Sequence, residues 1–462
     1  MTVKTRELNE RLLDQSRIAL KAAGDKDIEI AGGASEEIRI VYESDDFSVS
    51  TSGSNSRLGI RTLQDQRLGF VSTNSTSDAA LIEAVGEAYS MARLSPPSEH
   101  YSLAEPGPQH SPGKEFIHEN GDLLALPESQ IIDYTEEVIR EAMQDPRIRL
   151  DRVELALTRD AKTLVNSKGI ELSMRRSYLS WSAMGMARQD DQVTSFDYDG
   201  AVAFNTDQIA PRIAASMGRF RDSVISSLNP RSGKSYKGPV LIHPALVRQF
   251  ILGTISSNAN GKNQQDGTSP WKESLNQKVA SESLTVFEDP LDTERLETYL
   301  PFDREGFFTG KHNIVENGVL KFVGHNIYSA SRAGARPTGN ASGGSGSTPA
   351  VGFFNVKLEL NDSLDKKDLT ELKKSLGSGL LIKRFSGNAD PSSGHFSGVA
   401  KNSYWIENGE MFPVKEMMIS GNLFELLNSI VAASSGDFEI MGGARAPYLI
   451  VDGISVTSGS AV

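Results

Sequence analysis

Apolar and polar residues alternate one by one over residues 36–73, and this period of two is the pattern that most restricts the fold. The apolar members of the alternation are Ile38, Ile40, Tyr42, Phe47, Val49, Leu58, Ile60, Leu68 and Phe70. Successive side chains of a strand point to opposite faces, so the pattern predicts antiparallel strands with one face on a core and one in water. Residues 52–55 (Ser-Gly-Ser-Asn) predict a turn inside this run.

Helical periodicity surrounds strand-like segments elsewhere in the first half of the chain. Helices are predicted at 5–23, at 77–93, from Pro127 onward and at 205–228, and strands at 151–158, 162–166 and 170–187. The second helix is expected to bury Leu81, Ile82, Val85, Tyr89 and Met91. The proline-rich segment 95–126 is expected to be an irregular crossing loop. The order helix, strands, helix occurs twice, which is consistent with a duplicated α+β unit.

Residues 229–238 (Asn-Pro-Arg-Ser-Gly-Lys-Ser-Tyr-Lys-Gly) form the clearest boundary in the chain, because they are polar and contain proline and glycine near its midpoint. Their Gly-Lys-Ser is not a phosphate-binding loop, because Leu228 stands where that motif requires glycine. We therefore predict an N-terminal α+β domain at 1–228, a linker at 229–238 and a β-rich C-terminal domain at 239–462. The predicted fold class is α+β, with antiparallel sheets.

The second half is predicted to consist mostly of strands and turns after a helix at 244–257. Asn317-Gly318 and Asn408-Gly409 lie between extended segments, and Asn-Gly is the strongest short signal for a hairpin turn. Glu316 and Glu407 flank these turns, so we interpret them as solvated edge residues rather than catalytic carboxylates. A closing helix at 422–433, capped by Asn422, and a final strand at 447–456 are expected.

Composition limits the possible functions. The 462 residues include no cysteine, which excludes disulfides and cysteine–zinc sites and fits a reducing, cytoplasmic compartment. The formal net charge of −12 argues against direct binding of nucleic acid, which needs clustered lysine and arginine. No apolar run approaches the length that spans a membrane, and no signal peptide is apparent at the N-terminus.

A histidine between a strand and a helix invites a metal interpretation, but the residues after His243 do not support one. Zinc peptidases of one large class place His-Glu-x-x-His on a helix, where the histidines bind zinc and the glutamate polarises water. Here Pro244 follows His243, and Val247 and Arg248 stand four and five residues on. Valine has no ligand atom, and the guanidinium of arginine has no lone pair to donate.

Five motifs that follow in order resemble the TldD/PmbA (TldE) family of bacterial and archaeal proteins. They are residues 284–290 (Leu-Thr-Val-Phe-Glu-Asp-Pro), 302–306 (Phe-Asp-Arg-Glu-Gly), 314–320 (Ile-Val-Glu-Asn-Gly-Val-Leu), 337–340 (Pro-Thr-Gly-Asn) and 406–410 (Ile-Glu-Asn-Gly-Glu). Each motif alone is weak, but five in family order are specific. The likeness is strongest from about 236 to 462.

The resemblance implies a role without a metal centre in this chain. TldD-like members carry His-Glu-x-x-x-His and a later cysteine as zinc site, whereas PmbA-like (TldE-like) members lack this set. His243 falls on the first histidine and has no ligand partner, Pro244 falls on the glutamate, Arg248 on the second histidine, and the cysteine would fall near Met441. The chain therefore looks like the PmbA (TldE) type: no catalytic residue and no metal ligand are expected, and zinc only in a TldD-like partner.

The glycine-rich segment 336–349 has two interpretations. It is either a disordered surface linker or a mobile rim over a peptide groove, where glycine lets a backbone approach closely. The resemblance favours the rim, and it makes Gly339, Asn340, Gly343 and Gly344 the candidate groove residues.

Three functions remain open at this point. The first is the non-zinc subunit of a TldD–TldE-type peptidase, paired with a zinc-bearing chain and supplying the walls that hold unfolded peptides. The second is a stand-alone homodimer that binds peptides or regulates a protein partner, including the modulation of DNA gyrase that the family's older name suggests. The third is a divergent metallopeptidase that uses His243 with Asp289 and Asp303 and binds about one zinc per chain.

Overall fold

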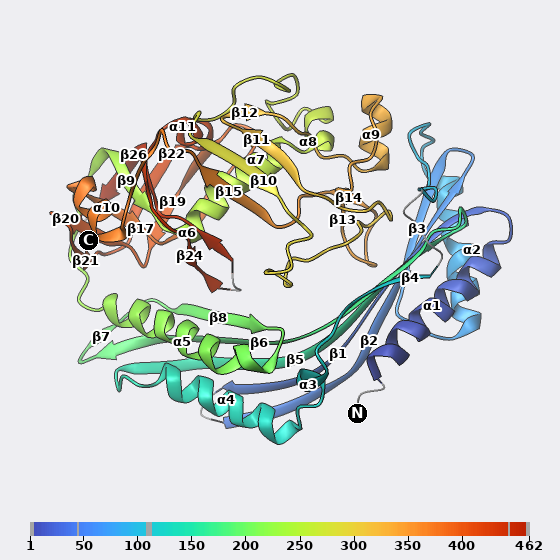
Figure 1. Cartoon of the computed structure of the whole chain (residues 1–462), viewed down its shortest axis with the longest axis horizontal. Helices are drawn as coiled ribbons and strands as arrows, with labels where there is room; N and C mark the ends of the chain where they lie inside the picture. The colour runs from blue at the N-terminus through green and yellow to red at the C-terminus, as the bar shows by residue number, and fades with distance from the viewer. Residues whose placement is uncertain (1–3, 44–45, 108–112, 442–443, 459–462) are drawn as a thin grey trace.

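The computed structural model describes residues 4–43, 46–107, 113–441 and 444–458, and the fold is α+β, as predicted. Figure 1 shows two lobes facing each other across a central space. We call residues 4–228 the N-lobe and residues 229–458 the C-lobe. Among the described residues, no helix is both long enough and apolar enough to cross a bilayer.

The N-lobe is built on one eight-stranded sheet with the order β3-β2-β1-β5-β6-β4, in which β7 and β8 also pair with β6. Its strands are β1 (Asp27–Glu43), β2 (Asp46–Gln64), β3 (Arg67–Thr73), β4 (Lys114–His118), β5 (Ile148–Asn166), β6 (Glu171–Gln189), β7 (Gln192–Val193) and β8 (Asp197–Ala203). Four of them are 17 to 19 residues long, well above the usual strand length. Figure 1 shows that these long strands curve across the whole width of the molecule.

Helices cover only one face of this sheet. They are α1 (Lys4–Ala23), α2 (Asp78–Leu94), α3 (Gly121–Leu124), α4 (Glu128–Ala142) and α5 (Ile209–Ser226), the last preceded by the short η1 (Thr206–Gln208). Ile30 of β1 packs in the cluster that holds α1 and α2, and Ile40 of β1 packs in the cluster that holds α4 and α5. Both positions are even-numbered, so both helix pairs lie on the same face. The other face carries the odd-numbered side chains of β1 and is turned toward the C-lobe.

Several local predictions for this lobe were wrong. Residues 52–55 do not turn: they continue β2, which stays paired to β1 with one register shift between Ser35 and Glu37. A β-bulge of this kind absorbs an extra residue without ending the strand. Residues 151–158 and 162–166 are likewise one strand, and the segment 95–126 contains β4 and α3.

The buried face of α2 and the length of the linker also differ from expectation. On α2, Leu81, Val85 and Tyr89 are buried as predicted, whereas the side chains of Ile82 and Met91 are 54% and 51% exposed. The predicted linker is shorter than 229–238, because β9 (Tyr236–Ile242) already begins within it.

The C-lobe holds a ten-stranded sheet with the order β18-β19-β22-β26-β9-β17-β20-β21, to which β23 and β16 attach at β26. Its strands are β9, β16 (Asp365–Lys367), β17 (Ser378–Ile382), β18 (Arg384–Ala389), β19 (His395–Lys401), β20 (Tyr404–Glu407), β21 (Glu410–Pro413), β22 (Met417–Asn422), β23 (Ile430–Ser434) and β26 (Leu449–Ser458). The helix α10 (Leu369–Leu376) packs on this sheet through Leu372 and Leu376, in one cluster with Leu241 and Tyr404.

A second, four-stranded sheet has the order β12-β11-β10-β15, and two further two-stranded sheets are formed by β13 with β14 and by β24 with β25. The remaining elements are β10 (Leu284–Glu288), β11 (His312–Glu316), β12 (Val319–Leu320), β15 (Val356–Leu360), β13 (Ala341–Ser342), β14 (Ala350–Val351), β24 (Phe438–Glu439), β25 (Arg445–Ala446), α8 (Gly261–Gln265) and α9 (Ile327–Ala333). Both Asn-Gly turns are confirmed: one joins β11 to β12, the other joins β20 to β21, and all four residues have positive φ.

The helix predicted at 244–257 forms, but its middle is wider than an α-helix. It runs as α6 (Pro244–Leu246), a π-helical segment η2 (Val247–Leu252) and α7 (Gly253–Asn258). Phe250 and Ile251 of η2 are fully buried between the two C-lobe sheets. The closing helix α11 (Leu423–Asn428) is capped by Asn422, as predicted, but ends earlier than expected, because β23 follows it.

The lobes meet at one end through four buried charged side chains, which we call the charge quartet: Glu29, Arg61, Arg304 and Glu305. Glu29 accepts from Arg61 (2.7 Å) and Arg304 (2.7 Å), and Arg61 also donates to Glu305 (3.0 Å). Every member is at least nine-tenths buried. Burial alone would raise the pKa of Glu29, but the two guanidinium groups outweigh it and hold this pKa below its ordinary value.

A second contact joins the lobes at the opposite end. Lys383 of the C-lobe donates to Asp197 of β8 (2.8 Å), and Ser223 of α5 donates to the same carboxylate. The hydroxyl groups of Tyr404 and Ser226 lie 2.6 Å apart. Because contact is made at both ends, the lobes form an arch around the space between them.

The substitution Arg61→Met tests the charge quartet. It leaves Glu29 and Glu305 buried with less compensation, and breaking a buried pair costs about 3–5 kcal/mol. We expect the midpoint of thermal unfolding to fall by several degrees, measured by calorimetry. The matched control is Arg140→Met, because Arg140 is 68% exposed at 3.7 Å from Glu137 and such pairs contribute roughly 0–1 kcal/mol. Equal unfolding midpoints for the two variants would contradict the account.

Candidate functional site

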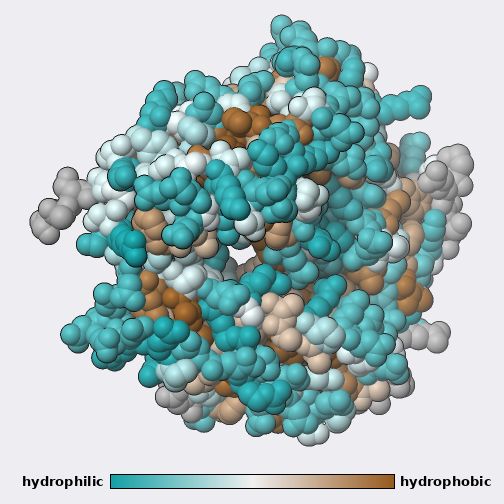
Figure 2. All heavy atoms as spheres, turned by 60° about the vertical axis from the view of Figure 1, so that its left-hand side comes forward, coloured by the Kyte–Doolittle hydropathy of each residue, from teal (hydrophilic) through white to brown (hydrophobic). Residues whose placement is uncertain are grey.

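A cavity of about 530 Å³ lies where the uncovered face of the N-lobe sheet meets the loops of the C-lobe. From the N-lobe it is lined by residues of three strands: Ala31, Gly32 and Gly33 of β1, Lys162, Thr163 and Leu164 of β5, and Met174 and Arg176 of β6. From the C-lobe it is lined by residues 297–300, 302–304, 341–345 and 353–355. Figure 2 shows an opening between the two lobes, bordered by hydrophilic and apolar side chains.

The end of the cavity nearest the charge quartet is closed by a glycine-rich loop of the C-lobe. The loop approaches β1 and β2 where they carry glycines: a Cβ added to Gly59 would lie 2.2 Å from the carbonyl oxygen of Ser345. A Cβ added to Gly33 would lie 3.2 Å from the hydroxyl of the same serine. The Nε of Arg304 donates to the carbonyl of Gly344 at 3.3 Å, so the charge quartet and the loop hold each other in place.

The predicted groove residues divide into two pairs. Gly343 and Gly344 line the cavity, and a side chain added at Gly344 would meet open space. Gly339 and Asn340 lie behind the loop. Gly339 has a φ of +79°, and an added Cβ would lie 2.7 Å from the carbonyl oxygen of Phe308. The Asn340 side chain is fully buried and donates to both oxygens of Glu288 (2.8 and 3.1 Å), so it supports the loop.

Apolar and cationic side chains lie side by side in the wall of the cavity, because Met174 of β6 is the cross-strand partner of Lys162 of β5. Leu164, Met174 and Phe302 belong to the apolar cluster at the interface of the lobes. Arg176 places its Nε 2.9 and 2.8 Å from the two carboxylate oxygens of Asp160, which neutralises the guanidinium. Lys162 is exposed, and it forms no ion pair with any residue that the structure describes.

The environment of Lys162 differs from that of a lysine on an open surface. Burial lowers its pKa, the positive charge of Arg176 lowers it further, and Asp160 only partly offsets these effects. A side chain that is reached by water and yet desolvated by the surrounding protein projects into an enclosed space. The ammonium of Lys162 is therefore held at the cavity.

Asp303 anchors the C-lobe side of the cavity. Its oxygens accept from the backbone N–H groups of Glu305 (2.9 Å), Phe307 (3.0 Å) and Ala341 (2.9 Å). Burial and the neighbouring charge of Glu305 raise the pKa of Asp303 to about 8, although the three backbone donors oppose the shift. This carboxyl group therefore adds little negative charge to the cavity at neutral pH.

His243 serves as the N-cap of α6. Its Nδ1 accepts from the backbone N–H of Ala245 at 3.2 Å, and its ring meets that of Tyr448 edge-on. Burial lowers its pKa to about 3, and Lys383 contributes to the shift. The ring is therefore neutral at pH 7. Because Nδ1 accepts a hydrogen bond, Nε2 carries the proton, and neither nitrogen offers a free lone pair to a metal.

The other positions that fall on the family's zinc ligands are Arg248 and Met441. Arg248 is half-buried, and burial and the charge of Arg295 lower its pKa, against the opposing effect of Glu297. Met441 is 44% exposed. Within the described ranges, no group of three or more His, Cys, Asp or Glu side chains is arranged to hold a metal ion. Three backbone donors use most of the acceptor capacity of Asp303, the carboxyl group that the divergent metallopeptidase hypothesis would use.

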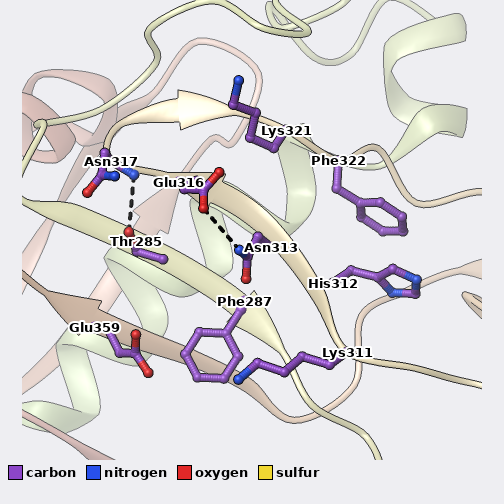
Figure 3. A pocket seen from close by; sticks show the side chains of 10 residues that line it. All are labelled: Thr285, Phe287, Lys311, His312, Asn313, Glu316, Asn317, Lys321, Phe322 and Glu359. Carbon is purple, nitrogen blue, oxygen red and sulfur yellow. Dashed lines mark hydrogen bonds between the residues drawn. The ribbon is translucent and has the colours of Figure 1, made fainter.

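A second hollow lies on the four-stranded sheet, on the face turned away from its core. Figure 3 shows Lys311 reaching over the ring of Phe287, with its ammonium 4.2 Å from the ring centre. Glu316 accepts from Asn313 at 3.4 Å in the same view, and it is exposed, as predicted for a hairpin edge. Glu407 is exposed as well, with Lys234 at 3.8 Å. Within this hollow the backbone N–H of Asn317 also donates to the hydroxyl of Thr285 at 3.1 Å.

Comparison with family models covers most of the chain. Residues 28–92 match the PmbA/TldA metallopeptidase domain 1, residues 121–219 match the central domain, and residues 234–458 match the C-terminal domain. The chain belongs to the PmbA/TldD family. The resemblance inferred from the five motifs is thus confirmed.

Individual relatives and solved structures match this chain along nearly its whole length. The Metalloprotease PmbA homolog of Haemophilus influenzae is 24% identical over 470 residues, covering 99% of this chain and 97% of the relative. The crystal structure of TldE from Thermococcus kodakarensis superposes with a TM-score of 0.81 at 24% identity, covering 97% of this chain and all of the other. A proposed modulator of DNA gyrase from Bacteroides thetaiotaomicron gives 0.82 at 23% identity, covering 98% and 99%. These structures share the fold.

The sequence reasoning missed Lys162, Arg176 and Arg304 as cavity residues of this PmbA/TldD family member. Lys162 and Arg176 lie inside strands, where charged residues are ordinary on a face exposed to water, so their types alone gave no signal. Arg304 lies in the turn of the motif at 302–306, which was used only for the family resemblance. A signal was present in the alternation of β5, where Asp160, Lys162 and Leu164 share one face. It could be used only after it was known that the C-lobe faces that side.

The raised pKa of Asp303 predicts a change of stability with pH. A carboxyl group with a folded-state pKa of about 8, above its ordinary 3.8, binds a proton in the folded chain that the unfolded chain has lost. Its contribution to stability is therefore lost as pH rises between these two values, by up to about 1.4 kcal/mol per pH unit. We expect the free energy of unfolding of the wild type to fall relative to that of Asp303→Asn as pH rises, measured by denaturant unfolding. A difference that stays constant over this range would contradict the assignment.

Proposed function

We propose that this chain is the non-zinc, PmbA/TldE-type subunit of a TldD–TldE-like metallopeptidase of the cytoplasm. It binds an unfolded peptide in the space between its lobes, and a zinc-bearing TldD-like partner cleaves the peptide. The observation that carries the proposal is the state of His243. Its Nδ1 accepts the N-cap hydrogen bond, so its Nε2 keeps the proton, and the neighbouring Pro244 and Arg248 offer no ligand atom.

The cavity supports a peptide as the bound substrate. Its volume lies in the range of small-ligand sites, and it combines an apolar wall with a few polar groups. Phe354 and Asn355 line it and lead directly into β15, which is an outer strand of the four-stranded sheet. An extended peptide can add to such a strand through main-chain hydrogen bonds, which gives affinity with little sequence selectivity.

A stand-alone, homodimeric regulatory protein is the second candidate. The observation that favours this candidate is that the solved structure of a proposed gyrase modulator has the same fold. The net charge of −12 disfavours direct contact with DNA, so this function would require a protein partner.

Metal content and cleavage separate the candidates. The chain is purified alone, a TldD-like partner alone, and the two together, and each sample is assayed for zinc by elemental analysis and for cleavage of an unfolded peptide. We expect no zinc and no cleavage from this chain alone, and cleavage that requires the partner. Stoichiometric zinc with chelator-sensitive cleavage by the chain alone would contradict the proposal. Failure of the chain to bind a TldD-like partner or to affect its cleavage would favour the regulatory candidate.

The substitution His243→Asn provides a sharper comparison within the complex. Asparagine is a favoured N-cap residue, so the variant retains an acceptor for Ala245 while removing the imidazole. We expect the zinc content of the complex and its rate of cleavage to stay unchanged. A loss of zinc or a large loss of rate would show that His243 takes part in the metal site.

A further inference from the structure

We propose that the cavity between the lobes is a binding site for the C-terminal carboxylate of a peptide whose last residue is apolar, with Lys162 and Arg304 as the groups that receive the carboxylate. The inference deepens the proposed function and rests on it, because it assumes that peptides enter the space between the lobes.

Two donors at the cavity have no acceptor among the described residues: the ammonium of Lys162 and the Nη2 of Arg304. Lys162 lines the cavity and is in no ion pair with the described residues, while the nearby Asp160 is already held by Arg176. The Nη2 of Arg304 is buried and donates to no atom of the residues that the structure describes, although the Nη1 and Nε of the same side chain donate to Glu29 and Gly344. A buried donor without an acceptor costs free energy, and a ligand that supplies an acceptor removes that cost.

The carboxyl groups close to these cations do not take the place of a ligand. Glu29 is shared by two arginines of the charge quartet. Glu297 pairs with Arg295 at 2.9 Å, and burial keeps Asp303 protonated at neutral pH. The cavity therefore has room for one additional negative charge.

The remaining features of the cavity select the kind of carboxylate. Leu164, Met174 and Phe302 give it an apolar wall that fits an aliphatic or aromatic side chain. The Oδ1 of Asn355 is a buried acceptor with no donor in the described part of the chain, and its orientation is fixed because Nδ2 donates to the carbonyl of Asp289 at 2.7 Å. The last residue of a peptide has a group for each of these features: an apolar side chain for the apolar wall, a carboxylate for the cations and an N–H for the Oδ1 of Asn355.

The proposal predicts discrimination between a free and a blocked C-terminus. Two fluorescent peptides of the same unstructured sequence end in leucine, one as the free acid and one as the amide, and their binding to the full chain is measured by anisotropy. A charge-assisted hydrogen bond is roughly twice as strong as a neutral one, so the acid should bind about tenfold or more tightly than the amide. N-Acetyl-leucine, added as a competitor, should displace the acid.

Variants at position 162 assign the effect to the cavity. Lys162→Met should lower the affinity for the acid about tenfold, to that for the amide, and should leave the amide unchanged. Lys162→Arg keeps the charge and should retain discrimination. Lys311→Met is the matched control, because Lys311 lies in the separate hollow of Figure 3, and it should bind both peptides like the wild type. Circular dichroism and thermal melting confirm that each variant is folded.

The outcomes separate this inference from the proposed function. Equal affinity for acid and amide, or full discrimination in Lys162→Met, would overturn the carboxylate site while leaving peptide binding intact. Binding of N-acetyl-leucine that depends on Lys162, without binding of either peptide, would support the carboxylate site and overturn the peptide function. Absence of binding by all three would overturn both.

Discussion

The buried charge quartet is the contact on which the arrangement of the two lobes depends. Glu29 and Arg61 come from adjacent strands of the N-lobe, and Arg304 and Glu305 come from one loop of the C-lobe. Buried ion pairs gain little net stability over apolar packing, but a separated member is strongly unfavourable. The quartet therefore penalises other ways of docking the lobes more than it stabilises this one. The carbonyl of Gly344 on Arg304 extends this control to the glycine-rich loop at the cavity.

The cavity between the lobes depends also on the long strands of the N-lobe. A sheet of such length twists and curves, and helices cover only one of its faces. The uncovered face meets the C-lobe at its two ends and leaves a space between them. Within that space Lys162 forms no ion pair with any residue that the structure describes, while its neighbour Arg176 is neutralised by Asp160. The same architecture that fixes the lobes thus leaves one cation free to meet a ligand.

Local chemistry made the α+β class, the Asn-Gly hairpins and the cap at Asn422 predictable from the sequence. Each depends on residues that are close in the chain. Strand lengths were not predictable in the same way, because a polar run such as residues 52–55 favours a turn in isolation and joins a strand only when β1 pairs beside it. The cavity was least accessible to sequence reasoning, since Arg61 and Glu305 are 244 positions apart. The family resemblance located the glycine-rich loop but could not separate the cavity-lining Gly344 from the buried Asn340.

The docking of the lobes is open to one direct measurement, because the chain has no cysteine and an introduced pair can react only with itself. The Cβ of Ser345 lies 4.0 Å from the position of a Cβ added to Gly33, within the range of a disulfide. In the double variant Gly33→Cys and Ser345→Cys, mild oxidation should give an intrachain disulfide in nearly all molecules, seen by mass spectrometry and thiol titration. The single variants serve as controls for bonds between chains. Two thiols that stay free under oxidation would contradict the docked arrangement, and with it the cavity.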